Sequence, residues 1–157
     1  MSITVSIPCK PYIKHWLEVK YGCPIRLPRN CSFKAQLLSC LTKEFQPKAY
    51  YNNELYPSSV EVAVGKNEIS TFGVSVAPQM HHFLHRTIRE QLELNIFIFV
   101  TSNNLSGSSI ESAIKAYQTI HGFSEEIFSY DAIRSIYFRY KKNIQKEFPK
   151  TATKIAA

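Results

Sequence analysis

The feature that most constrains the fold is a pair of apolar stripes in the last third of the chain, separated by Gly122. The first stripe follows the spacing of one helix face: Ile110, Ala113, Ile114, Tyr117 and Ile120. The second stripe gathers on one side of a helix at about 100° per residue: Ile133, Ile136, Tyr137, Tyr140, Ile144 and Phe148. Because glycine adopts the left-handed conformation that ends helices, we predict one helix from about 110 to 121 and a second ending near Glu147.

The starts of these two helices carry side chains suited to capping. Ser108 and Glu111 fit a capping box, in which the hydroxyl accepts a backbone N–H and the glutamate reaches back to the helix start. Residues Ser129–Asp131 offer caps for the final helix. Between the helices, Glu125 and Glu126 lie where a helix N-terminus stabilises negative charge, so we expect a structural role for them.

Strands are predicted where β-branched residues alternate with small or polar ones. Residues 2–7 alternate in this way and end before a proline, which predicts a strand. Residues 60–64 and 74–76 alternate on either side of Gly65–Glu68, which predicts a hairpin. Residues 25–27 can add a short edge strand.

Helical spacing predicts three further helices: Pro11–Tyr21, Phe33–Phe45, and a long helix that begins at Pro78. Residues 94–101 are aromatic and β-branched and could form a buried strand, but no Gly or Pro separates them from the long helix, which favours its continuation. The first of the three helices ends at Gly22, and its face with Trp16 and Tyr21 has the spacing of a buried face, which favours a place in the core over a base-stacking platform. The segment 48–59 is rich in Tyr and Asn and is expected to be a loop.

These elements predict an α+β protein with a small mixed or antiparallel sheet and helices, followed by a C-terminal helical segment like a helix-turn-helix. Residues 102–108 (SNNLSGS) are the clearest break in the pattern. We therefore expect an α/β region over 1–101, a helical segment over 102–149 and a disordered tail over 150–157. With 45% hydrophobic residues the chain is not wholly disordered, and five glycines among 157 residues disfavour a dinucleotide-binding fold.

The charge points to a polyanionic partner. The chain carries a net charge of +7, and the excess lies in residues 1–57 and 101–157. On the last predicted helix, the side opposite the apolar stripe combines cations with polar and aromatic residues: Arg134, Ser135, Phe138, Arg139, Lys141, Lys142 and Lys146. In a nucleic-acid complex the first three would face base edges and the last four would hold phosphates. The alternative is a helical hairpin with a solvated basic face.

A resemblance agrees with the nucleic-acid interpretation. The stretch AIKAYQTIHGFSEEIFSYDAIRSIYFRYKKN, from Ala113 to Asn143, resembles the C-terminal segments of small uncharacterised proteins of phages and conjugative elements. It is more loosely similar to the helix-turn-helix end of Mor-type phage transcription activators. The shared features are a His-Gly-Phe break and a second helix with a Tyr-x-x-Tyr-Lys-Lys ending, over about a fifth of the chain. The resemblance implies DNA binding and an origin in a mobile element.

Other constellations are weaker signals for chemistry. His81 and His85 have the spacing of a zinc-binding pair, but no third ligand can be placed. The four cysteines form no C-x-x-C pair, which favours isolated thiols. We therefore expect no catalytic site, no metal and no other cofactor.

The sequence thus predicts a non-enzymatic, cytoplasmic DNA-binding protein, used as a transcriptional regulator, in which the first part carries or dimerises the C-terminal unit. The longest apolar run, Ile96–Val100, is too short to cross a membrane. Two alternatives remain. The chain could be a protein-interaction or assembly module without a nucleic-acid role, or a metal-dependent enzyme that uses His81 and His85.

Overall fold

The computed structural model describes residues 2–44 and 54–148, and the chain divides into two compact units, Met1–Arg89 and Glu90–Ala157. The predicted α+β class is confirmed. The described residues form six α-helices and four strands, and the strands pair antiparallel two by two. The tail predicted over 150–157 lies outside the described residues. The loop predicted over 48–59 lies partly outside them.

The sheet of the first unit pairs the N-terminal strand with a strand far along the sequence. β1 (Ser2–Cys9) lies antiparallel to β3 (Ser58–Gly65), with Val5 opposite Val62. One face of this pair is buried, as period-2 alternation requires: Val5, Ile7, Cys9, Val60, Val62 and Val64. The edge strand expected at 25–27 is a single parallel bridge between Ile25 and Val62.

Helix α1 (Pro11–Tyr21) forms where the apolar spacing predicts it. Pro11 stands in its first turn, and Gly22, at φ 82°, ends it with an N–H that donates to the Glu18 carbonyl at 2.8 Å. Trp16 is buried and Tyr21 half-buried, so this face belongs to the core as expected.

Helix α2 (Ser32–Ser39) is shorter than the predicted 33–45. It ends early because Leu41 and Thr42 leave the helix to form β2 (Leu41–Thr42), which pairs with β4 (Ser75–Val76). The apolar Leu41 fits a helical stripe, but a long-range pairing uses it instead. Local spacing carries no information on such a partner.

The predicted hairpin is wrong. β3 pairs with β1 and β4 pairs with β2, while the residues between β3 and β4 form α3 (Lys66–Phe72). The helix is favoured because the Glu68 carboxylate caps it, accepting the Gly65 N–H at 2.9 Å. Gly73 then ends α3 at φ 123°, so close to the Thr42 carbonyl that a Cβ would overlap it.

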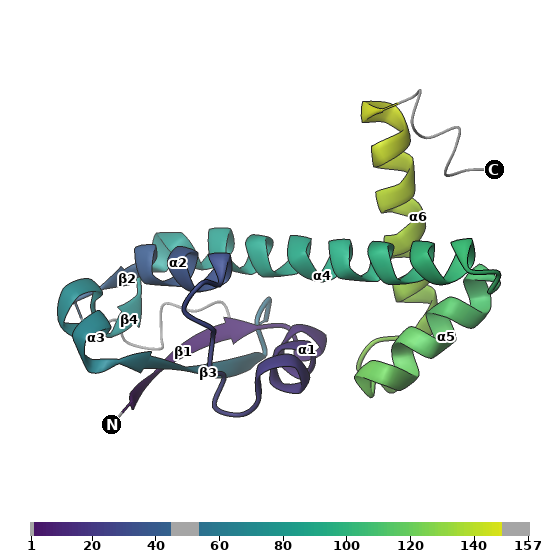
Figure 1. Ribbon diagram of the computed structural model, residues 1–157. Coiled ribbons are helices and arrows are strands. Elements are labelled where there is room, and N and C mark those ends of the chain that lie inside the picture. Colours follow the sequence, from purple (N-terminus) through teal and green to yellow (C-terminus); the bar gives the residue numbers. More distant parts are fainter. Residues whose placement is uncertain (1, 45–53, 149–157) are drawn as a thin grey trace. The chain divides into compact units, whose positions relative to one another are not determined.

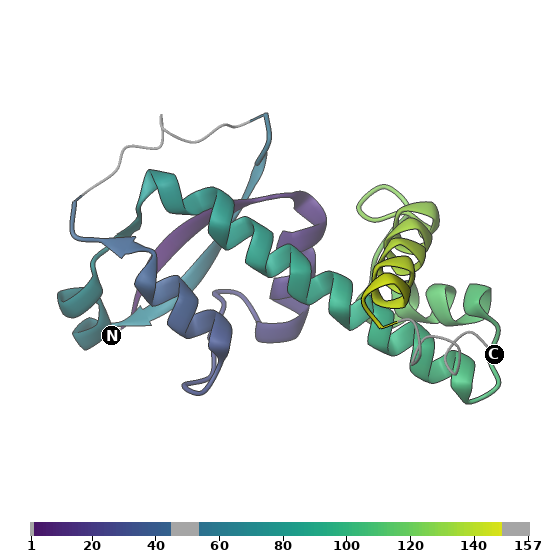
Figure 2. The ribbon, with the colours of Figure 1, turned by 90° about the horizontal axis from the view of Figure 1, so that it is seen from above.

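The long helix is confirmed, including its continuation through 94–101. After the 3-10 turn η2 (Pro78–Met80), α4 (His81–Leu105) runs without a break through the boundary between the two units. One row of its buried residues recurs every four positions: Leu84, Ile88, Leu92, Ile96 and Val100. The first turns of α4 and helix α2 lie on the same side of the β1–β3 sheet (Figures 1 and 2).

The break at 102–108 begins later than expected. Residues 102–105 still belong to α4, and the turn follows at Ser106 and Gly107, where φ is 102° at the glycine. This turn lies inside the second unit, between α4 and α5 (Ile110–His121), whereas the two units divide at residues 89 and 90. In the part of the chain that the structure describes, no helix is both long and apolar enough for a membrane crossing.

Candidate nucleic-acid interface

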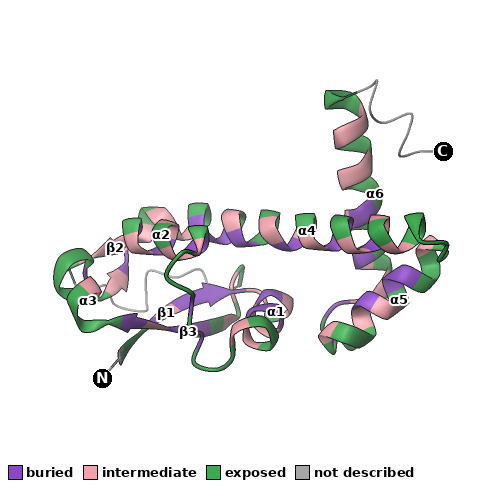
Figure 3. Cartoon of the chain, viewed as in Figure 1, coloured by how far each residue is buried: buried purple, intermediate pink, exposed green. Residues whose placement is uncertain are grey.

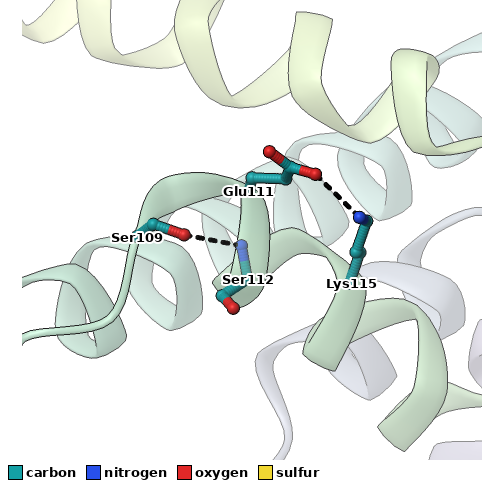
Figure 4. Close-up of polar contacts among 4 residues, drawn as sticks. All are labelled: Ser109, Glu111, Ser112 and Lys115. Carbon is teal, nitrogen blue, oxygen red and sulfur yellow. Dashed lines mark hydrogen bonds and ion pairs between the residues drawn. The ribbon is translucent and has the colours of Figure 1, made fainter.

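Helix α5 precedes the candidate interface, and its cap differs from the predicted one. The Ser109 hydroxyl, not that of Ser108, accepts the N–H three residues on, from Ser112 at 3.1 Å (Figure 4). The N3 position is thus Ser112, which has no carboxylate to reach back. Glu111 instead bonds Lys115 one turn along the helix at 2.7 Å, so the predicted capping box does not form.

The connection from α5 to α6 (Tyr130–Glu147) is held by specific contacts. Gly122 is left-handed, at φ 65°, as predicted. The Glu125 carboxylate accepts the Tyr130 N–H at 3.1 Å and the Gln118 side-chain N–H at 3.0 Å. Glu125 therefore has the structural role expected for it, because its carboxylate links α5 to the start of α6. The Ser129 hydroxyl caps α6 by accepting the Ala132 N–H.

The connection over residues 122–129 is longer than the about 3–4 residues that join the helices of a helix-turn-helix. Phe123 and Phe128 within it are buried and meet edge to face, with ring centroids 5.1 Å apart. The segment therefore has a small core of its own rather than a minimal turn.

The inward side of α6 packs on the second part of α4. Ile133 and Tyr137 are buried, and Phe97 of α4 stacks on Tyr137 with centroids 5.8 Å apart and tilts against Tyr140 at 5.0 Å. Burial then decreases along the helix, since Ile144 is half-buried and Phe148 exposed. Figure 3 shows the same change in colour along α6, whose C-terminal half extends beyond α4.

A partly buried hydrogen bond links α5 to α4. The hydroxyl of Tyr117, a residue with no exposed surface, donates to the Asn95 side-chain oxygen at 2.8 Å. Rings of Phe99, His121 and Phe123 surround Tyr117. The scaffold that carries α6 is therefore an aromatic core with a directional contact inside it.

The outward side of α6 carries most of the predicted residues. Five of the seven are exposed and have no carboxylate partner among the described residues: Arg134, Ser135, Phe138, Lys142 and Lys146. Lys141 is half-buried because it lies beside the packed side of the helix. The residues thus form an exposed basic face, with Lys141 at its border.

Arg139 is placed differently from its neighbours. Its guanidinium bonds the Glu93 carboxylate of α4 at 2.6 Å. The Arg139 side chain is 57% exposed, whereas that of Glu93 is only 14% exposed. The sequence predicted a phosphate contact for Arg139; in the structure its charge is compensated, and its first role is to join α6 to α4.

Arg134 and Phe138 form a pair on the exposed face. The Arg134 guanidinium lies over the Phe138 ring, 5.4 Å from its centroid, and this ring in turn meets Tyr137 edge-on at 5.2 Å. The stacking holds the guanidinium plane without using its N–H donors. Those donors remain available to an acceptor outside the protein.

The histidine and cysteine side chains considered for metal binding or catalysis form no such site among the described residues. In residues 2–44 and 54–148 no group of three His, Cys, Asp or Glu side chains is placed to hold a metal ion. His85 is buried beside the Tyr56 ring, and burial together with the nearby charges of Lys10 and Arg89 lowers its pKa to about 4. All four cysteines are free thiols, and burial raises the pKa of Cys9 to about 12, which makes it a poor nucleophile.

Sequence reasoning missed the residues that position the interface. Glu93 and Asn95 stand on α4, far along the chain from their partners Arg139 and Tyr117, and no local pattern marks such pairs. The chain matches no protein-family model, no curated protein and no solved structure.

Proposed function

We propose that this chain is a non-enzymatic DNA-binding protein, a transcriptional regulator of a phage or other mobile element, which contacts DNA through the basic face of α6. The observation that carries the proposal is that Arg134, Lys142 and Lys146 are exposed and have no ion pair with another described residue. Cations without a carboxylate partner attract phosphates more strongly than paired ones, because no internal pair must be broken.

The proposed roles follow the position of each residue along α6. Residues in the first turns of a recognition helix contact base edges in the major groove, and here these are Arg134, Ser135 and Phe138. An arginine can bond two acceptors of a guanine, and an aromatic ring can contact a thymine methyl group. Lys141, Lys142 and Lys146 in the later turns would hold phosphates.

The phage or mobile-element context rests on the resemblance of residues 113–143. The long connection between α5 and α6 departs from a standard helix-turn-helix. The proposal therefore requires α6 to enter the groove, and it does not require α5 to cross the backbone as in that motif.

The test measures binding of the full chain to duplex DNA by fluorescence anisotropy over a range of salt concentrations. Lys142→Ala is compared with Lys115→Ala, which removes the same charge from α5, where Lys115 is already paired with Glu111. We expect the first variant to flatten the slope of log K against log salt by about one unit and the second to leave it unchanged. Equal slopes for both variants would remove α6 from the interface.

Arg134→Ala tests the assignment of base contacts. Sequences selected from a random duplex library by the wild-type chain are tested again with the variant. We expect the variant to lose about 1–3 kcal/mol of discrimination at one base position. Unchanged preference with weaker overall binding would place Arg134 on phosphates instead.

A protein-interaction module is the second candidate, because α4 exposes apolar side chains in the second unit: Leu94, Ile98 and Leu105. An interaction module of this kind would bind a partner protein but would not bind duplex DNA at low salt. The anisotropy experiment therefore separates the two functions.

A further inference from the structure

A solvent-open cavity of about 770 Å³ lies in the first unit, whereas α5 and α6 of the candidate interface belong to the second. Its lining residues come from the loop before α2, from α2 itself, from the last residue of β3 and from the start of α3, and α2 contacts α3. Its size is within the range of about 300–1,000 Å³ that small-molecule sites occupy. Its lining combines charged, polar and apolar residues: Arg29, Lys34, Ala35, Leu38, Gly65, Lys66, Asn67 and Glu68.

The cavity keeps a net positive charge after the ion pair between Lys34 and Glu68 is counted. One oxygen of Glu68 bonds the Lys34 ammonium at 2.7 Å, and the other accepts the Gly65 N–H at 2.9 Å. The acid is therefore fully engaged and compensates Lys34. Arg29 and Lys66 are exposed and have no ion pair with another described residue.

The pKa of Glu68 reflects the cations around its carboxylate. Lys34, the Gly65 N–H and the charge of Arg29 together lower the pKa of Glu68 below its usual value. Most of this lowering comes from Lys34 and the Gly65 N–H, which Glu68 itself engages, and the charge of Arg29 adds a smaller part.

We propose that this cavity binds a phosphorylated small molecule, with Arg29 and Lys66 contacting the phosphate group and Ala35 and Leu38 contacting the organic part. Two cations suit a doubly charged group, and arginine binds phosphate oxygens with two parallel N–H donors. The Asn67 amide supplies a further donor. The site is independent of DNA binding by α6.

The test is calorimetric titration of the full chain, without DNA, with inorganic pyrophosphate and with phenyl phosphate, which adds an apolar part. The pocket variant is the double substitution Arg29→Ala with Lys66→Ala. Its control is Lys20→Ala with Arg26→Ala, which removes the same charge from exposed positions of the same unit outside the cavity. All four positions are exposed, so the fold is expected to persist, and circular dichroism checks this.

We expect one site per chain, at least tenfold weaker binding of both probes in the pocket variant, and less than twofold change in the control. Glu68→Gln tests whether removing the negative charge of this carboxylate from the cavity strengthens anion binding. Glutamine still accepts the Gly65 N–H and so keeps the cap of α3, but it releases Lys34, and we expect binding to tighten at least threefold.

Equal weakening in pocket and control variants would mean that net charge alone attracts the anions, and it would overturn the proposal. Loss of DNA affinity in the pocket variant, with unchanged affinity for pyrophosphate, would also overturn it, because the cavity would then take a DNA phosphate. A failure of DNA binding in the wild-type chain has no bearing on this titration, so the two proposals are tested separately.

Discussion

Arg139 and Lys142 lie three positions apart on one helix, both cationic and both exposed, yet the structure assigns them different roles. Arg139 bonds Glu93 at 2.6 Å, and Lys142 has no carboxylate partner among the described residues. We predict that Lys142→Ala weakens DNA binding with little effect on folding, whereas Arg139→Ala destabilises the second unit and changes DNA binding little.

The magnitudes follow from the exposure of each group. One phosphate contact changes log K by about 0.9 per decade of salt. With its contribution taken as zero at about 1 M salt, loss of Lys142 should cost about eightfold in affinity at 0.1 M salt and about fourfold at 0.2 M. The Arg139–Glu93 pair is half exposed on the arginine side and mostly buried on the glutamate side. Its loss should cost about 1 kcal/mol of unfolding free energy, at the upper end of values for surface pairs.

Glu93→Gln makes the test sharper because its expected effect on DNA binding has the opposite sign. With the carboxylate gone, Arg139 is released, and we expect tighter DNA binding and a steeper salt slope. Affinity is measured by anisotropy at two salt concentrations and stability by urea unfolding. If Arg139→Ala weakens DNA binding as much as Lys142→Ala does, and Glu93→Gln has no effect, the role assigned to the ion pair is wrong.

Three further predictions concern the stability of the fold. Tyr117→Phe removes the hydrogen bond to Asn95 and should lower the unfolding free energy by about 1–2 kcal/mol in urea titrations. Ser109→Ala should cost about 1 kcal/mol because it removes the cap of α5, whereas Ser108→Ala should cost almost nothing; equal costs would contradict the observed cap. His85 has a pKa of 6.5 when unfolded and about 4 when folded, so the unfolded chain binds more protons between these values. Stability should therefore be full above pH 6.5 and fall as the pH drops toward 4, and His85→Gln should flatten this dependence.

The helices that could be predicted from the sequence are those whose apolar spacing and end signals lie within the helix itself or next to it. α1, α5 and α6 each combine an apolar stripe with an end signal within a few residues, such as Gly22 or Gly122, and all three form at the expected positions. The cap of α5 was misplaced by one residue because two consecutive serines both fit the pattern, and only the structure shows which hydroxyl accepts the bond.

The strand pairing could not be predicted, for the opposite reason. The partner of β3 is β1, with paired residues 49 to 63 positions apart, and alternation within β3 is equally compatible with a neighbouring hairpin strand. In the structure the residues after β3 form α3 instead, where Glu68 accepts the Gly65 N–H at the helix start and pairs with Lys34 of α2. The same limit applies to the candidate interface, since the composition of α6 predicted its exposed face but not the carboxylate on α4 that neutralises Arg139.

The packing of α6 changes along its length in a way that suits the two kinds of DNA contact proposed for it. Ile133 and Tyr137 hold the first half against the aromatic core, whereas Phe148 at the far end is exposed. Base recognition needs side chains held in a fixed geometry, because a hydrogen bond weakens steeply with angle. Phosphate attraction by a lysine tolerates variation in position, since an ammonium acts as a point charge. A firmly packed first half with Arg134 and a less packed second half with Lys142 are therefore the arrangement that the proposed division of roles requires.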